Sequence, residues 1–146
     1  MLIKKITANI LGILLILILF CPAKAQIQTL GEFEGVKIPV NLKHEDTVVE
    51  KGKYDLEFIK HGQNAFYLKF KKKNKTVCLI PGGERVMYKN QSDLALLNKD
   101  PDIPENASFK MKKNPALKIA YIIFETGKHS MICPFYKIRF KIKYEE

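Results

Sequence analysis

Apolar and polar residues alternate along much of this chain, most strictly near its end. Between positions 136 and 144 the apolar residues are Tyr136, Ile138, Phe140, Ile142 and Tyr144, and the cations between them are Lys137, Arg139, Lys141 and Lys143. Successive side chains of a strand point to opposite faces of its sheet. The pattern therefore predicts a terminal strand with one apolar face and one cationic face.

Shorter alternating runs precede this segment and are separated by turn-forming residues. They cover positions 36–42, 53–58 and 65–71, and a further strand is expected over Thr76–Ile80 after the Lys72–Lys75 turn. Strong β formers with period-two alternation and closely spaced turns predict an antiparallel meander. Pro39 cannot donate a ladder hydrogen bond, so the 36–42 run is expected at a sheet edge.

Four segments depart from this alternation. Gln26–Gly35 is polar and contains glycines, which predicts a loosely held arm. Leu117–Glu125 is apolar on both faces, which is typical of a central strand covered on both sides. A short helix is expected at Ser92–Leu97 with Ser92 as its N-cap. Two prolines make 100–106 irregular.

These elements predict an all-β domain, an antiparallel sandwich of seven to nine short strands with at most one short helix. A small closed β-barrel is the alternative. The segment Val48–Leu56 resembles a recurrent piece of small exported bacterial β-sandwich domains, in which a turn with glycine leads into a Tyr-x-Leu strand start, here Gly52, Tyr54 and Leu56. The resemblance implies a fold and carries over no catalytic residue.

Residues 1–25 have the three parts of a secretory signal. Lys4 and Lys5 precede an apolar run from Ile10 to Phe20, and Ala23 and Ala25 are small residues before the expected cleavage at Gln26. A membrane anchor, or a lipoprotein modified at Cys21, is the alternative. Cleavage would leave a single β domain, 26–146, with no transmembrane segment, exported to the periplasm or secreted.

Charge and cysteine content refine this picture. The formal charge of +10 falls to +7 with the signal, because Lys4, Lys5 and Lys24 leave with it. The remaining chain is basic, which favours anionic partners. The two remaining cysteines, Cys78 and Cys133, predict a disulfide in an exported chain, with two buried free thiols as the alternative.

Binding is expected of basic rows that the fold brings together. The candidates are Lys137, Arg139, Lys141 and Lys143 on the last strand, Lys69 and Lys71 with Lys72, Lys73 and Lys75 at a hairpin, and Lys110, Lys112 and Lys113. Side by side they would form a cationic face for an envelope protein or an anionic surface. Nucleic acid is not expected, because the aromatic residues of the last strand lie opposite its cations. Solvated lysines that keep strand edges soluble are the alternative.

The sequence contains no motif for catalysis, a metal or a cofactor. It has no Gly-x-Ser-x-Gly elbow, no phosphate loop and no His-Glu-x-x-His motif. We therefore expect a non-enzymatic binding or structural module of the cell envelope or extracellular space. The alternative is a carrier of small apolar ligands, with a cavity lined by Phe66, Leu68, Tyr121 and Phe140.

Overall fold

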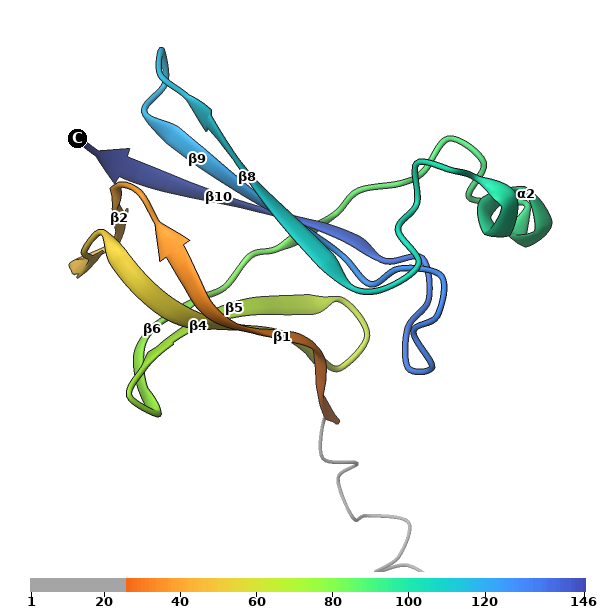
Figure 1. The fold of residues 1–146 in the computed structure, drawn as a ribbon, viewed down its shortest axis with the longest axis horizontal. Helices are drawn as coiled ribbons and strands as arrows, with labels where there is room; N and C mark the ends of the chain where they lie inside the picture. The colour runs from red at the N-terminus through yellow and green to blue at the C-terminus, as the bar shows by residue number, and fades with distance from the viewer. Residues whose placement is uncertain (1–25) are drawn as a thin grey trace, which may run out of the picture.

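The computed structural model describes residues 26–146, which form two antiparallel sheets packed face to face (Figure 1). Sheet A has the strand order β1 (Ile27–Ile38), β4 (Gly52–His61), β5 (Ala65–Lys72) and β6 (Lys75–Ile80). Sheet B has the order β3 (Thr47–Val49), β2 (Asn41–His44), β10 (Lys137–Glu145), β9 (Ile119–Glu125) and β8 (Ser108–Asn114), and β7 (Glu84–Arg85) pairs with β10. The predicted all-β sandwich is confirmed, with ten strands in the described residues, and the closed-barrel alternative is wrong.

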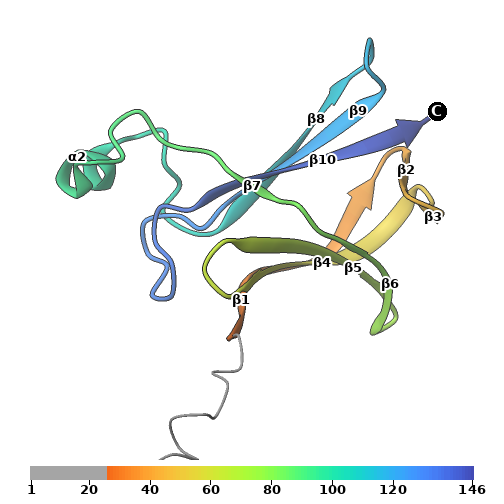
Figure 2. The same cartoon turned by 180° about the vertical axis from the view of Figure 1, so that it is seen from behind.

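The chain passes between the sheets three times, through Glu50 and Lys51 from β3 to β4 and at two prolines. The first passage is at Pro39, where β1 of sheet A ends and β2 of sheet B begins two residues later. The last follows Pro81, which separates β6 of sheet A from β7 of sheet B (Figure 2). Proline lacks the N–H that would continue a ladder, so it favours the end of one pairing and the start of another. The run 36–42, expected as one edge strand, is thus divided between two sheets.

Strand β1 corrects the expectation of a loose arm at 26–35. It pairs with β4 from Ile27 to Ile38, with irregularities between Thr29 and Gly31 and between Phe33 and Val36. A Cβ atom added at Gly31 would lie 2.9 Å from the Phe124 ring, so glycine allows β1 to pack closely here. The polar composition of this segment reflects an edge strand whose outer side meets solvent.

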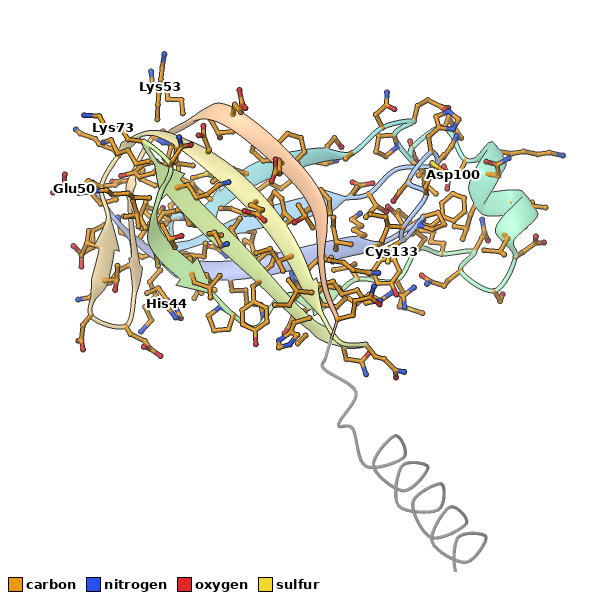
Figure 3. All side chains as sticks on the ribbon, turned by 90° about the horizontal axis from the view of Figure 1, so that it is seen from below. His44, Glu50, Lys53, Lys73, Asp100 and Cys133 are labelled. Carbon is orange, nitrogen blue, oxygen red and sulfur yellow. The ribbon has the colours of Figure 1, made fainter. Side chains whose placement is uncertain are left out.

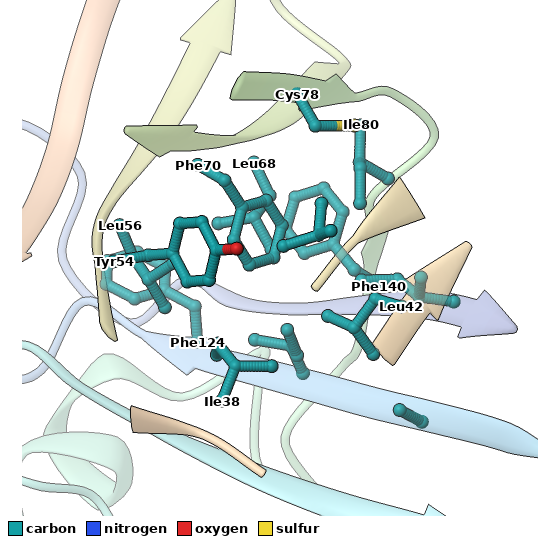
Figure 4. Close-up of a cluster of buried hydrophobic side chains, with 14 of the residues drawn as sticks. Ile38, Leu42, Tyr54, Leu56, Leu68, Phe70, Cys78, Ile80, Phe124 and Phe140 are labelled. Carbon is teal, nitrogen blue, oxygen red and sulfur yellow. The ribbon is translucent and has the colours of Figure 1, made fainter. Parts of the chain in front are cut away.

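The core lies between the two sheets and is built from the inward faces of both (Figure 4). Phe58 of β4 stacks on Phe124 of β9, with ring centroids 4.3 Å apart, and Phe140 of β10 lies 6.0 Å from Phe58. The apolar face of the terminal strand is confirmed, because Ile138, Phe140, Ile142 and Tyr144 are all buried. Such large apolar areas removed from water are the main source of stability in a domain of this size.

Strand β9 is central, as predicted, but the core covers one of its faces and only side chains of neighbouring strands cover the other. It lies between β10 and β8, with Ala120, Ile122 and Phe124 buried in the core. Its other face carries Ile119, Tyr121 and Ile123, which are half-buried. Long cationic side chains of the flanking strands cover this apolar row, since the Arg139 guanidinium lies 5.7 Å from the centre of the Tyr121 ring.

The helix α2 (Leu94–Lys99) forms where it was expected but begins later. Its N-cap is Asp93 and not Ser92, because the Asp93 carboxylate accepts hydrogen bonds from the backbone N–H groups of Ala95 and Leu96. Leu97 is the buried residue of this helix. No helix in the described part of the chain has the length and apolar character needed to cross a membrane.

The predicted disulfide is wrong in this structure, where Cys78 and Cys133 are both free and buried. Cys78 pairs in register with Phe70, which in turn pairs with Leu56. The Cys133 sulfur instead lies 3.8 Å from the Lys60 Nζ atom. Lys60 is four residues from Leu56 along β4, about 13 Å of strand. The two cysteines thus lie beside different parts of sheet A, beyond the reach of a disulfide of about 7 Å between Cα atoms; Figure 3 labels Cys133 and Figure 4 labels Cys78.

The signal peptide expected at 1–25, with its cleavage before Gln26, lies outside the described residues. The domain assignment 26–146 coincides with the part of the chain that the structure describes. Export to the periplasm or the extracellular space therefore stays a prediction.

Candidate functional site

The outer face of sheet B collects six of the twelve cations that the sequence singled out. In register across β8, β9 and β10, Lys110 aligns with Ile123 and Arg139, and Lys112 aligns with Tyr121 and Lys141. Residues directly opposite each other on neighbouring strands point to the same side of a sheet. Two rows of cations therefore flank an apolar row. We call this surface the basic face; it consists of Lys110, Lys112, Ile119, Tyr121, Ile123, Lys137, Arg139, Lys141, Lys143 and Lys43.

Glu84 and Glu125 neutralise the part of this face around Arg139 and Lys110. Glu84 of β7 lies 2.8 Å from the Arg139 Nη2 atom and 4.0 Å from the Lys141 Nζ atom. The hydrogen bond from Arg139, with the charge of Lys141, lowers the pKa of the Glu84 carboxyl. Glu125, whose side chain is 4% exposed, lies 3.9 Å from the Lys110 Nζ atom. Arg139 is thus held in an ion pair, whereas Lys112 and Lys143 have no carboxylate within 4.0 Å among the described residues.

The open end of the basic face forms a groove, which we call the lysine groove. It has a volume of about 580 Å³ and is lined by Lys43, His44, Glu45, Leu117, Lys118, Lys141, Ile142, Lys143, Tyr144 and Glu145. Lys43 of β2 and Lys143 of β10 are directly opposite each other in the ladder. Like charges in this position repel each other and destabilise a sheet. An anion between them would relieve this repulsion.

Lys43 and Lys118 are lysines of the groove that sequence reasoning did not connect with the last strand. Lys43 follows the run 36–42, which gave no sign that the chain would cross to the other sheet and pair with β10. Lys118 has a positive φ of 52° in the β8–β9 turn, and its carbonyl oxygen accepts a hydrogen bond from the Tyr144 N–H. That turn places its side chain beside β10, a contact that depends on long-range register.

Lys69 and Lys71 do not join the basic face. They lie on β5 of sheet A, where both ammonium groups contact Glu57, at 3.7 Å and 3.2 Å from its Oε2 atom. Burial raises the pKa of Glu57, but the hydrogen bonds from Thr29 and Lys71 and the charges of Lys69 and Lys71 outweigh it and lower the pKa overall. Sheet A therefore uses these lysines to hold one carboxylate. Of the other predicted rows, Lys110 and Lys112 lie on the basic face. Lys72 and Lys75 are opposite each other in the ladder beside the β5–β6 turn.

The irregular segment after β7 closes the opposite end of the basic face. The Tyr88 hydroxyl donates a hydrogen bond of 2.9 Å to the Glu125 Oε2 atom, and the Lys137 Nζ atom lies 5.5 Å from the centre of the Tyr88 ring. Burial, with the neighbouring Glu125, raises the pKa of Tyr88 strongly. These contacts leave Lys137 less open to a partner than Lys141 or Lys143.

Other reactive side chains lie in the β9–β10 connection. The His129 Nε2 atom lies 2.7 Å from the Glu105 Oε2 atom, and both side chains are exposed. The neighbouring Ser130 hydroxyl accepts a hydrogen bond from the Cys133 N–H. Within residues 26–146, no three His, Cys, Asp or Glu side chains come together as a set of metal ligands.

No protein-family model, no curated protein and no solved structure matches this chain.

Proposed function

We propose that this chain is an exported, non-enzymatic β-sandwich that acts by binding an anionic partner through the basic face of sheet B. The observation that carries the proposal is the register of β8, β9, β10 and β2, which places lysines from three strands around one apolar row. A concentration of one sign of charge on a hollowed surface raises the local concentration of oppositely charged ligands. Export is supported by the signal pattern of residues 1–25.

A binding role is favoured over a carrier role by the packing of the core. Tyr121, expected to line an internal cavity, lies on the outer face in register with Lys112 and Lys141. Between the sheets, Phe58 and Phe124 stack at 4.3 Å, and Phe66, Leu68 and Phe140 belong to the same buried cluster. The apolar interior is therefore used for packing, and the chemistry available to a partner lies on the surface.

The test measures binding to anionic vesicles and to soluble polyanions, with the triple variant Lys112→Glu, Lys141→Glu and Lys143→Glu. The wild type should bind at least one of these ligands, more weakly as salt rises, and the variant should lose at least about tenfold in affinity. The matched control, Lys51→Glu, Lys53→Glu and Lys75→Glu, removes the same charge from exposed positions on or beside sheet A and should retain most of the affinity. Equal losses in both variants, or no binding by the folded wild type, would contradict the proposal.

A further inference from the structure

We propose that the ligand of the basic face is a linear polysaccharide that bears carboxylates, held by its acid groups in the lysine groove and by a sugar ring on Tyr121. This inference rests on the proposed function and specifies the partner of the same face. It follows from the carboxylates that already lie beside the lysines of the groove, from the position of Tyr121, and from the predominance of lysine over arginine on this face.

Carboxylates of the chain itself already occupy part of the lysine groove. The Glu145 Oε1 atom lies 3.7 Å from the Lys43 Nζ atom, and the Glu146 Oε2 atom lies 3.5 Å from the Lys118 Nζ atom. All four side chains are about half exposed, so these pairs are weak and can exchange with an external anion. The groove therefore accepts carboxylates between its walls, and a ligand with regularly spaced carboxylates can replace Glu145 and Glu146.

Tyr121 is a half-buried ring between two rows of cations, and a sugar ring would meet the part of it that the Arg139 guanidinium, 5.7 Å from the ring centre, leaves open. It is aligned with Lys112 on one neighbouring strand and with Lys141 on the other, and adjacent strands are about 4.8 Å apart. A tyrosine ring offers an apolar face with a polar hydroxyl at its edge, which suits a ligand that is apolar on one side and hydroxylated at its rim. A sugar ring has this character. A carboxylate on the same ring would lie within reach of Lys112 or Lys141.

The shape and composition of the face argue against two other anionic partners. A flat membrane surface is contacted best by protruding apolar residues, whereas Ile119, Tyr121 and Ile123 are half-buried between the lysine rows. Single-stranded nucleic acid is held by several stacking aromatic residues, and among the described residues of this face Tyr121 is the aromatic one. Arginine, which grips phosphate with two parallel hydrogen bonds, is represented here by Arg139, which already pairs with Glu84.

The experiment measures dissociation constants of the purified protein for polygalacturonate, neutral dextran, oligothymidine and phosphatidylglycerol vesicles, at the same ionic strength. We expect the tightest binding for polygalacturonate and none for neutral dextran. Tyr121→Ala should weaken polygalacturonate binding about tenfold, while Tyr121→Phe, which keeps the ring, should bind nearly as the wild type. The double variant Glu145→Gln and Glu146→Gln frees Lys43 and Lys118, so its affinity should rise about two- to fivefold.

The outcomes separate this inference from the function on which it rests. Tighter binding of oligothymidine or vesicles than of polygalacturonate, with loss in the Lys112, Lys141 and Lys143 variant, would overturn the polysaccharide and leave the anionic partner in place. An unchanged affinity in Tyr121→Ala, with its fold intact by circular dichroism, would also overturn it. Absence of binding to every charged ligand would overturn the proposed function itself.

Discussion

The outer faces of the two sheets are built from the same alternation of charged and apolar residues, yet their charges are arranged in opposite ways. At the centre of sheet A, Glu57 lies between Lys69 and Lys71 and accepts a hydrogen bond from Thr29. On sheet B, Lys143 faces Lys43 directly, and the nearby carboxylates of Glu84 and Glu145 are exposed. The comparison shows that a lysine becomes part of a stabilising ion pair or of a cationic surface according to its cross-strand neighbour.

The difference also separates stability from binding. Glu57 has a side chain that is 13% exposed, so the ion pairs of sheet A are partly shielded from water. The ion pair of Glu84 on sheet B is more open, with the Glu84 side chain 54% exposed. Shielded pairs contribute more to folding than exposed ones, because solvent and salt screen the exposed ones. Sheet B has a shielded carboxylate of its own, Glu125, beside Lys110 and Tyr88, so the contrast with sheet A holds for the part of the basic face around Lys141 and Lys143.

The largest expected loss of stability follows from a change in the core that lies between the two sheets and supports both outer faces. Phe58→Ala deletes a ring that is 1% exposed and stacks on Phe124 of the other sheet, so we expect a loss of about 3–5 kcal/mol in the free energy of unfolding. Urea denaturation followed by circular dichroism measures it. Tyr67→Ala, on the outer face of the same sheet, should cost clearly less. Similar losses in the two variants would show that the sheets do not share one core.

The next effect compares one carboxylate from each face. Glu57→Ala leaves Lys69, Lys71 and Thr29 without their acceptor and should lower the free energy of unfolding by about 1–2 kcal/mol. Glu84→Ala removes an exposed pair on sheet B and should cost less than about 1 kcal/mol. Chemical denaturation of both variants in one buffer gives the difference. A larger loss for Glu84→Ala would reverse the roles assigned to the two faces.

The pH dependence of stability should show the same contrast. The pKa of Glu57 is lower in the folded chain than in the unfolded one, so its contribution is complete above the unfolded pKa of about 4.3 and is lost as the pH falls through the folded pKa. Unfolding curves from pH 7 down to about pH 2.5 should therefore fall less steeply for Glu57→Gln than for the wild type. Parallel curves would mean that Glu57 has the same pKa in both states.

The smallest expected change in stability comes from single Lys→Glu variants. These variants distinguish the two faces by their binding of polyanions. Both sheets contain lysines directly opposite each other, Lys43 with Lys143 on sheet B, and Lys37 with Lys53 and Lys72 with Lys75 on sheet A. Lys143→Glu and Lys53→Glu both convert repulsion into attraction, so each should raise the free energy of unfolding by about 0.2–1 kcal/mol. Polyanion binding should weaken only in Lys143→Glu. A loss of binding in Lys53→Glu as well would extend the binding surface to sheet A.

The sequence by itself determined the local features of this fold. The alternation at 136–144 identified the terminal strand and its buried side, and Asp93 to Leu97 lay within the one short helix expected. Both patterns are local, because the direction of a side chain in a strand and the capping of a helix depend on residues close in sequence. The same rules identified every lysine of the basic face as outward-facing except Lys43, which lies in β2 just beyond the predicted run 36–42.

The tertiary structure alone decided which outward lysines meet. Lys69 and Lys141 look alike in sequence, but strand order places them on opposite sheets, one beside Glu57 and the other in the lysine groove. It also made an edge strand of residues 27–38, turned Tyr121 outward and kept Cys78 apart from Cys133. The physical reason is that pairing between distant strands is chosen by the packing of the whole core, which no local alternation contains.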